Sequence, residues 1–125
     1  MNTPNDLLYA KSHEWLRLEQ GKGCVGITDH AQSALSDVVF VELPKAGRTV
    51  KAGEVVATVE SVKAASDIYS PVEGTIVESN ATLTSDPGLI NREPYGQGWL
   101  FKINPAQPKP NGLLTATEYT ATLPS

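Results

Sequence analysis

The amino-acid sequence predicts a mainly β fold with a few short helices. Ten glycines and nine prolines in 125 residues indicate many turns between short elements. Runs rich in Val and Ile and bounded by glycine are typical of strands, and the clearest pair lies between Gly53 and Gly74. A chain of this length has room for one modest core. We therefore expect one domain over residues 1–125, with its core at about 8–104.

The N-terminal part predicts strands joined by a tight turn. Residues 7–18 alternate loosely between apolar and polar side chains, which indicates one or two strands. Gln20 to Gly23 forms a turn sequence, and Cys24, Val25 and Ile27 follow as the next strand. Cys24 is predicted to be a small buried side chain.

A short helix and another strand follow. Thr28 or Asp29 can cap a helix from about His30 to Ser36, because both side chains accept hydrogen bonds from the first helical N–H groups. The apolar side chains of this helix share one face. Residues 38–43 are strongly β-forming and end at Pro44.

The C-terminal third predicts smaller elements. Thr115 and Glu118 have the spacing of a capping box, which predicts a short helix over 115–122 that contains Tyr119. The other predicted elements are a helical turn at 87–90, a turn at 95–98, a last strand at 99–103 and a Pro-rich linker at 105–110.

A weak internal repeat links the two halves of the predicted sheet region. Residues 41–50 align without gaps on residues 68–77, and both segments place an apolar residue, Pro, Gly and Val at the same spacing. A true duplication predicts two similar half-sheets related by a pseudo-twofold axis, with the segment between them as the link.

That linking segment predicts a β-hairpin with Lys63 at its tip. With Val62 and Lys63 as the central turn residues, the predicted pairs are Val59 with Ser66, Ala57 with Ile68, and Val55 with Ser70. This register puts one apolar face together, formed by Val55, Ala57, Val59, Ile68 and Val72. The absence of Asn-Gly or Gly-Gly favours a type I turn. Lys63 is thus either a presented group or an ordinary soluble turn residue.

Composition excludes several function classes. A net charge of −4 and a pI near 5.1 argue against nucleic acid or an anionic membrane surface as a partner. A single cysteine cannot form an internal disulfide. Because no apolar run has the length of a membrane span and the N-terminus is too polar for a signal peptide, we expect a cytoplasmic protein. A processed organellar protein would instead lie in the mitochondrial matrix.

The sequence contains no convincing catalytic or metal-binding set. Ser12, His13 and Glu14 are the residue types of a hydrolytic triad, but neighbouring residues of a strand point to opposite faces. Ser12 and Glu14 would share a face and could line a polar groove together. Two distant histidines and one cysteine give no metal-ligand spacing.

Several motifs resemble, in the same order, those of the H proteins of the glycine cleavage system, over about residues 8–104. The tip sequence 60–67 is the most specific of them. The others are Ser12-His13-Glu14-Trp15, residues 26–32 and 39–44, Asn91 with Pro94-Tyr95, and Gly98-Trp99. The Pro-rich segment with Asn111-Gly112 departs from the family, whose members usually carry an acidic helical stretch there.

The resemblance implies a lipoyl- or biotinyl-like barrel-sandwich hybrid that acts as a carrier and is not an enzyme. Lys63 would hold covalent lipoic acid, attached by a lipoyl transferase or ligase that recognises the hairpin residues Glu60, Ser61, Val62 and Ala64. The expected partners are the pyridoxal-phosphate glycine decarboxylase (P protein), the tetrahydrofolate-dependent aminomethyltransferase (T protein) and dihydrolipoyl dehydrogenase (L protein). We expect a monomer. Ser12, Glu14 and Asp67 match the family's cleft for the loaded arm, which implies that a carboxylate of Glu14 or Asp67 pairs with the arm's protonated amine.

Three alternatives remain at this point. A paralogue that relays lipoate to other complexes needs the same lysine and the same hairpin. A biotin carrier is disfavoured because such hairpins usually flank the lysine with methionines, whereas Val62 and Ala64 stand here. An unmodified interaction module predicts that no lipoyl group is added.

Overall fold

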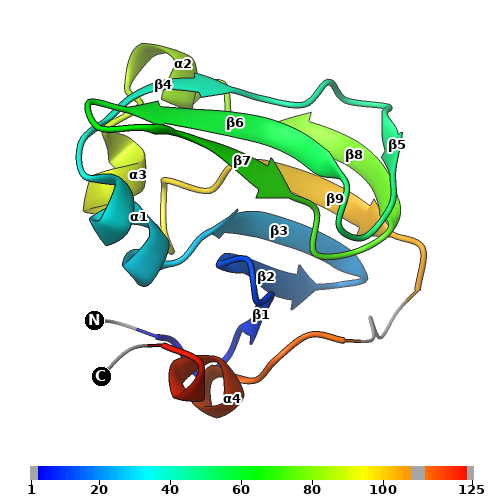
Figure 1. Cartoon of the computed structure of the whole chain (residues 1–125). Coiled ribbons are helices and arrows are strands. Elements are labelled where there is room, and N and C mark those ends of the chain that lie inside the picture. Colours follow the sequence, from blue (N-terminus) through cyan, green and yellow to red (C-terminus); the bar gives the residue numbers. More distant parts are fainter. Residues whose placement is uncertain (1–2, 108–111, 124–125) are drawn as a thin grey trace.

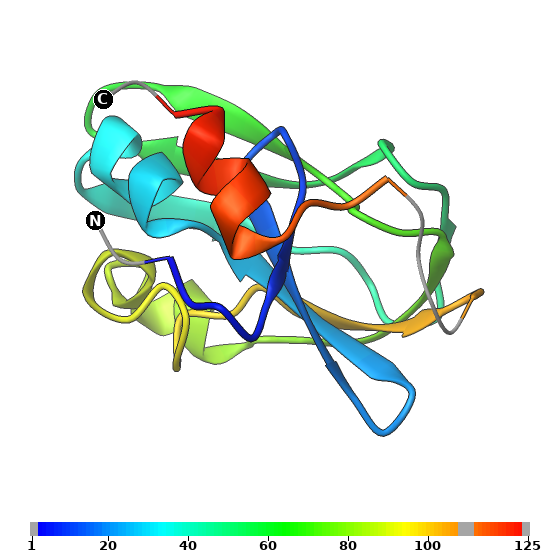
Figure 2. The ribbon, with the colours of Figure 1, turned by 90° about the horizontal axis from the view of Figure 1, so that it is seen from below.

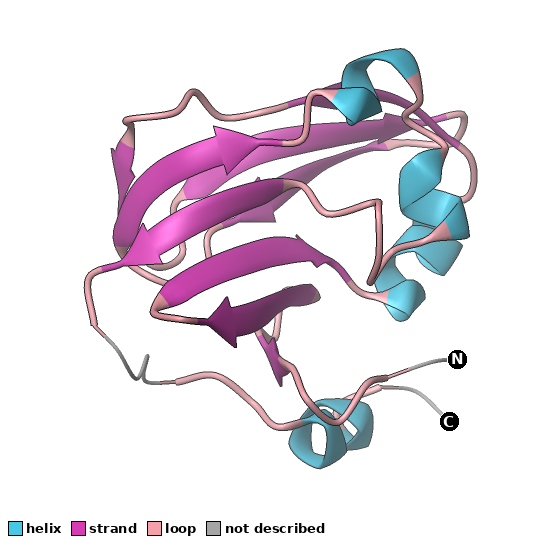
Figure 3. Ribbon diagram, turned by 180° about the vertical axis from the view of Figure 1, so that it is seen from behind, coloured by secondary structure: helices cyan, strands magenta, loops and turns pink. Residues whose placement is uncertain are grey.

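The computed structural model describes residues 3–107 and 112–123 and consists of two antiparallel sheets with short helices at their margins (Figures 1 and 3). The larger sheet has six strands in the order β1-β2-β3-β9-β8-β5, and the smaller has three in the order β4-β6-β7. The mainly β prediction is confirmed. The strands are β1 Leu8–Tyr9, β2 Glu14–Glu19, β3 Lys22–Ile27, β4 Val38–Glu42, β5 Thr49–Val50, β6 Val55–Ser61, β7 Ala65–Tyr69, β8 Gly74–Ser79 and β9 Phe101–Pro105.

The core lies between the two sheets. Its side chains alternate along the strands of both layers, as expected when each sheet buries one face. Trp15, Tyr9 and Tyr119 form a second, smaller cluster between the large sheet and the C-terminal helix. Fully buried members of the main core include Val25, Val59, Leu83, Ile90, Leu100, Phe101 and Ile103.

The tight turn after β2 has the chemistry of a right-twisted hairpin. Gln20 and Gly21 both have positive φ, 52° and 79°, which is the requirement of a primed turn. Glu19 therefore pairs directly with Lys22. The predicted turn at 20–23 is correct in place but shorter, because Lys22 and Gly23 already belong to β3.

The hairpin of β6 and β7 has the predicted register near its tip. Val59 pairs with Ser66 and Ala57 with Ile68. The third predicted pair is wrong. A shift in register between Val55 and Ala57 pairs Val55 with Tyr69 instead of Ser70, so that Val56 turns into the core while Val55 is 41% exposed.

The internal repeat corresponds to two similar crossings between the sheets. Residues 41–50 lead from β4 of the small sheet to β5 of the large one, and residues 68–77 lead from β7 to β8 in the same way. β5 and β8 then pair antiparallel. This arrangement agrees with two half-sheets linked by the β6–β7 hairpin.

Four short helices complete the fold: α1 Asp29–Leu35, α2 Thr82–Ser85, α3 Leu89–Arg92 and α4 Ala116–Ala121. Thr28 caps α1, and Thr115 and Glu118 form the predicted capping box at α4. Figure 2, which views the molecule from below, shows α4 in front of the sheets, and Tyr119 of α4 bonds to Thr28 at the cap of α1. No helix within residues 3–107 and 112–123 combines the length and hydropathy needed to cross a membrane.

Several predicted boundaries are wrong by a few residues. The last strand begins at Phe101, not Trp99, and extends to Pro105. The helical turn expected at 87–90 is α3 at Leu89–Arg92, and α2 was not predicted. Of the predicted linker 105–110, residues 108–110 lie outside the described residues.

Candidate functional site

The hairpin tip presents Lys63 on a turn that one serine side chain organises. The Ser61 hydroxyl accepts hydrogen bonds from the backbone N–H groups of Lys63 and Ala64, at 3.1 and 3.0 Å, and donates to the carbonyl of Ala64. Neither central residue has positive φ, which agrees with the predicted type I turn. Lys63 is exposed, as predicted for a presented group.

The tip rests against the C-terminal end of α1. The N–H of Val62 donates to the carbonyl of Asp37 at 3.0 Å, and Nζ of Lys63 donates to the carbonyl of Ala34 at 3.3 Å. The last carbonyls of a helix lack intrahelical partners and carry partial negative charge, so an ammonium group is favoured there. The lysine side chain is therefore directed toward α1.

A cleft of about 200 Å³ begins where the lysine ends. Ala34, which accepts the hydrogen bond from Lys63, is also part of the cleft wall. The cleft separates α1 from β7, and the turn before β2 closes one side of it. Its lining residues are Ser12, His13, Ile27, His30, Ala31, Ala34, Leu35, Ser66, Asp67 and Ile68.

The structure brings Ser12 and Asp67 together on the cleft wall, from sequence positions far apart. Glu14 lies behind Ser12 and is only 1% exposed, so its carboxylate does not itself line the cleft. Its two oxygens accept hydrogen bonds from the Ser12 hydroxyl and from the backbone N–H of Tyr69. Any influence of Glu14 on a bound group would therefore pass through Ser12 or through its charge.

Burial raises the pKa of Glu14 to about 7, although its hydrogen bonds with Ser12 and Tyr69 act in the opposite direction. This carboxyl group therefore changes charge close to neutral pH. A neighbouring serine hydroxyl can donate to the carboxylate or accept from the protonated acid, so it suits both states.

Two further residues of the site, His30 and Tyr119, were missed by sequence reasoning. The rings of His13 and His30 lie 4.8 Å apart at one end of the cleft, and Nδ1 of His13 is 2.7 Å from the hydroxyl of Tyr119. Nothing in the spacing of these residues indicates that they meet. The short helix that carries Tyr119 was predicted, but its docking position was not.

The strand expected at Ser12 and His13 is wrong. Residues 11–13 form a turn, and His13 has a φ of 77°, so Ser12 and His13 do not alternate across a strand. Both line the cleft, but each has another partner: Ser12 donates to Glu14, and His13 bonds to Tyr119. They do not form a hydrogen-bonded nucleophile and base.

The predicted recognition residues surround the lysine. Glu60, Val62 and Ala64 are exposed, with 69% of Val62 accessible, and Ser61 is half-buried because it organises the turn. An exposed valine of this size beside the lysine is available to a partner protein.

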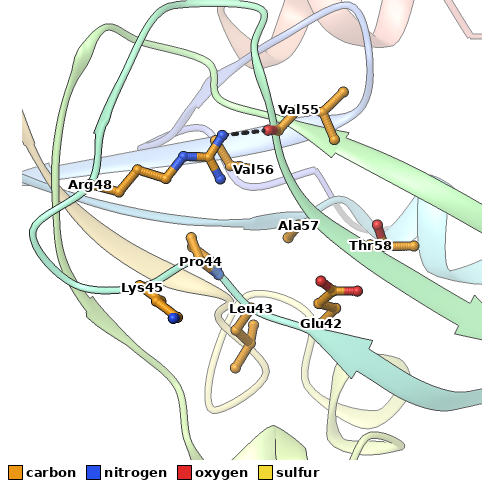
Figure 4. Close-up of a pocket in the computed structure, with 9 residues that line it drawn as sticks. All are labelled: Glu42, Leu43, Pro44, Lys45, Arg48, Val55, Val56, Ala57 and Thr58. Atoms are coloured by element: carbon orange, nitrogen blue, oxygen red, sulfur yellow. Dashed lines mark hydrogen bonds between the residues drawn. The ribbon is translucent and has the colours of Figure 1, made fainter.

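A larger hollow of about 510 Å³ lies at the other end of β6, where β4 diverges from it (Figure 4). Arg48 crosses this hollow, donates to the carbonyl of Val55 at 3.1 Å and pairs with Glu54 at 2.7 Å. Its other lining residues are the apolar Leu43, Pro44, Val55, Val56 and Ala57, together with Glu42, Lys45 and Thr58. Its charged residues are Glu42, Lys45 and Arg48, and it contains neither Lys63 nor a histidine.

The chain is similar over nearly its full length to known proteins. The family model described as glycine cleavage H-protein matches residues 7–125. Glycine cleavage system H proteins of Opitutus terrae and Cronobacter sakazakii are 55% and 56% identical, over 94% and 98% of this chain and 94% and 96% of their own length. A crystal structure of a glycine cleavage system H protein from Mycobacterium marinum superposes with a TM-score of 0.88 at 44% identity, covering 94% of this chain and 96% of that one.

These similarities confirm both the resemblance and the predicted barrel-sandwich arrangement of the strands. They also cover the hairpin, the cleft and α4, so the site does not lie in an added segment. The chain belongs to the glycine cleavage H-protein family, the lipoyl carriers of the glycine cleavage system.

Proposed function

We propose that Lys63 carries lipoic acid in amide linkage and that the chain shuttles the aminomethyl group of glycine between enzymes of glycine cleavage. The observation that carries this proposal is the exposed Lys63 on a rigid turn, with its Nζ 3.3 Å from a residue of the adjoining cleft. Once attached, the dithiolane supplies a sulfur that accepts the aminomethyl group and a dithiol that returns electrons.

The residues around the lysine suit an attached arm. Amide formation removes the positive charge of Lys63 but leaves one N–H on the side chain, which can still donate to the carbonyl of Ala34. That bond would direct the root of the arm toward the cleft. At about 200 Å³ the cleft is smaller than the roughly 300–1,000 Å³ of pockets that bury drug-sized ligands. Its size suits the end of the lipoyl arm.

The cleft residues suit a cationic end group. A protonated amine at the end of the arm would find the exposed carboxylate of Asp67 and the hydroxyl of Ser12 on the wall. Glu14 would add negative charge from behind Ser12 when it is ionised. We propose that these three residues hold the amine and shelter it from water.

The chain itself would catalyse no step. Tethering raises the effective concentration of the arm at each docked enzyme. The proposed partners are the P protein, the T protein and the L protein, together with the lipoyl transferase or ligase that recognises Glu60, Ser61, Val62 and Ala64. We propose a cytoplasmic location, because the similar H proteins come from bacteria.

Mass spectrometry of tryptic peptides tests the modification. Protein expressed with lipoate should gain the mass of lipoic acid less one water, on the peptide that contains Lys63. Trypsin should no longer cut after that lysine. Lys63→Arg, which keeps the positive charge, should show no gain. A gain on another lysine, or none on the wild-type chain, contradicts the proposal.

A reconstituted glycine decarboxylation assay then separates the carrier from a lipoate relay. With P, T and L proteins, the lipoylated chain should support release of carbon dioxide from glycine, and the Lys63→Arg variant should not. A lipoylated chain that supports no release, yet donates its lipoyl group to another acceptor domain, would identify the relay.

A further inference from the structure

A chain of hydrogen bonds connects the C-terminal helix to the histidine end of the cleft. The hydroxyl of Tyr119 on α4 lies 2.7 Å from Oγ1 of Thr28 and 2.7 Å from Nδ1 of His13. The ring of Tyr119 is fixed from its other side, because it stacks on Tyr9 with centroids 4.8 Å apart and planes at 11°. Tyr119 thus joins β1, the cap of α1 and the cleft.

The partners of the Thr28 hydroxyl determine which group donates in each of these hydrogen bonds. Its oxygen already accepts a bond from the N–H of Ala31, and its side chain is fully buried. Within the described residues, Tyr119 is the acceptor in reach of the Thr28 hydroxyl hydrogen. If that hydrogen pointed elsewhere, a buried donor would be left unpaired. Thr28 therefore donates to Tyr119, which must in turn donate to Nδ1 of His13.

We propose that Tyr119 is a positioning residue that holds His13 as the neutral imidazole with its hydrogen on Nε2, and so keeps positive charge out of the cleft. The proposal has two halves. The hydrogen-bond half is that Tyr119 sets the tautomer of His13, and it stands without the proposed function. The cleft half is that a neutral His13 favours a cationic arm, and it rests on the proposed function.

Protonation of His13 would break this arrangement. A hydrogen on Nδ1 would face the hydrogen that Tyr119 donates, and reversing the chain would leave the buried Thr28 hydroxyl without its acceptor. The titratable groups that face His13 are His30 on α1, Asp67 on β7 and Tyr119 on α4, with Glu14 beside it on β2 and Lys11 in the same turn. Burial, and then His30, lowers the pKa of His13. The hydrogen-bond chain acts in the same direction.

A neutral His13 matters because of what shares the cleft. With His13 neutral, Asp67 and, when ionised, Glu14 supply negative charge at the cleft, which attracts an ammonium group. An imidazolium in a cleft of this size would repel the same group at short range. Tyr119 would therefore extend the pH range over which the cleft can hold a cationic arm.

Nitrogen NMR of the unmodified protein tests the hydrogen-bond half. At about pH 7.5 the wild-type His13 should show a hydrogen on Nε2 and none on Nδ1. Tyr119→Phe keeps the stacked ring but removes the hydroxyl, so the His13 midpoint should rise by roughly 0.5–1 pH unit and the two tautomers should mix. Tyr9→Phe is the matched control. The hydroxyl that it removes donates to the Pro4 carbonyl and does not contact His13, so the titration of His13 should not change.

A wild-type His13 with its hydrogen on Nδ1 overturns the proposal, and that measurement needs no variant to fold. Equal titration of His13 in Tyr119→Phe and Tyr9→Phe overturns it as well.

Decay of the aminomethyl-loaded protein tests the cleft half. At about pH 6.5, Tyr119→Phe should lose its aminomethyl group roughly two- to fivefold faster than the wild type and Tyr9→Phe. If the NMR result holds but all three proteins decay at one slow rate, His13 does not act on the arm and the cleft half is overturned. If all three decay as fast as a loaded free lipoamide, the sheltering in the proposed function fails instead.

Discussion

The backbone N–H of Val62 donates to the carbonyl of Asp37, with nitrogen and oxygen 3.0 Å apart. This bond ties the lysine tip to the junction between α1 and β4. Asn91 on α3 holds the same junction: its Oδ1 accepts from the N–H of Val38 at 2.9 Å, and its Nδ2 donates to the carbonyl of Ser36 at 2.7 Å. The position of the tip therefore depends on an asparagine from a distant part of the sequence.

Replacing Asn91 by Ala should loosen the junction between α1 and β4 that holds the hairpin tip in place. The N–H of Val38 and the carbonyl of Ser36 would lose their partner, which should lower the free energy of unfolding by roughly 1–3 kcal/mol. We also expect a lower kcat/KM for lipoylation of Lys63 by a lipoyl ligase. Urea unfolding and initial rates of lipoylation measure the two effects.

Asn80→Ala is the matched control for this variant. Asn80 is buried, whereas Asn91 is half-buried, and it donates to two backbone carbonyls, those of Gln97 and Trp99, both at 2.8 Å. It should be destabilised to a similar extent but lipoylated at the wild-type rate. Equal losses of lipoylation rate in both variants would indicate that global stability, and not the position of the hairpin tip, limits the reaction.

Ser61→Ala should disorder the turn itself at small cost in global stability. The hydroxyl accepts from the N–H groups of Lys63 and Ala64, and without it these exposed groups would bond to water. The free energy of unfolding should fall by about 1 kcal/mol, while the KM of the lipoyl ligase should rise because the lysine is less well positioned. Ser61→Thr keeps the hydroxyl and should restore the KM. An unchanged KM for the alanine variant would contradict a role of the turn.

The two repeat glycines should respond differently to alanine. A Cβ on Gly74 would lie 2.3 Å from the carbonyl oxygen of Asn104 on β9, so the strands would have to separate. The equivalent Gly47 has open space around it but a φ of 91°. We expect Gly74→Ala to cost about 3 kcal/mol or more and Gly47→Ala about 1–2 kcal/mol in unfolding free energy. Equal urea midpoints would contradict the close approach of β8 and β9.

The sequence predicts those parts of the fold that depend on neighbouring residues. The hairpin register near Lys63 follows from alternation, and the capping box at Thr115 follows from spacing. The register shift at Val55 could not be predicted, because it depends on how β6 turns between the two sheets. The same holds for the turn at His13, whose positive φ no local rule requires.

The site could be predicted only in part. Lys63 is identified by its place at the tip of the hairpin, and Ser12 and Asp67 by the family motifs that contain them. His30 and Tyr119 join the site because the turn at His13 contacts both α1 and α4, which is decided by tertiary packing. Alternation places Ser12 and Glu14 on one face, but only the structure reveals that Glu14 is buried behind Ser12.

Glu14→Gln should make the protein more stable above neutral pH. The pKa of Glu14 rises on folding from near 4.5 to about 7, so its stabilising contribution is complete below about pH 4.5 and is lost as the pH rises through 7. Glutamine stays neutral, and its amide can accept from the N–H of Tyr69 while it donates to Ser12. The difference in unfolding free energy between variant and wild type should therefore grow between about pH 5 and pH 8, by an amount on the order of 3 kcal/mol. Urea unfolding over this range measures it, with the exposed Glu19→Gln at the other end of β2 as the control. Parallel stability curves for wild type and Glu14→Gln would mean that this buried carboxyl group keeps its ordinary pKa.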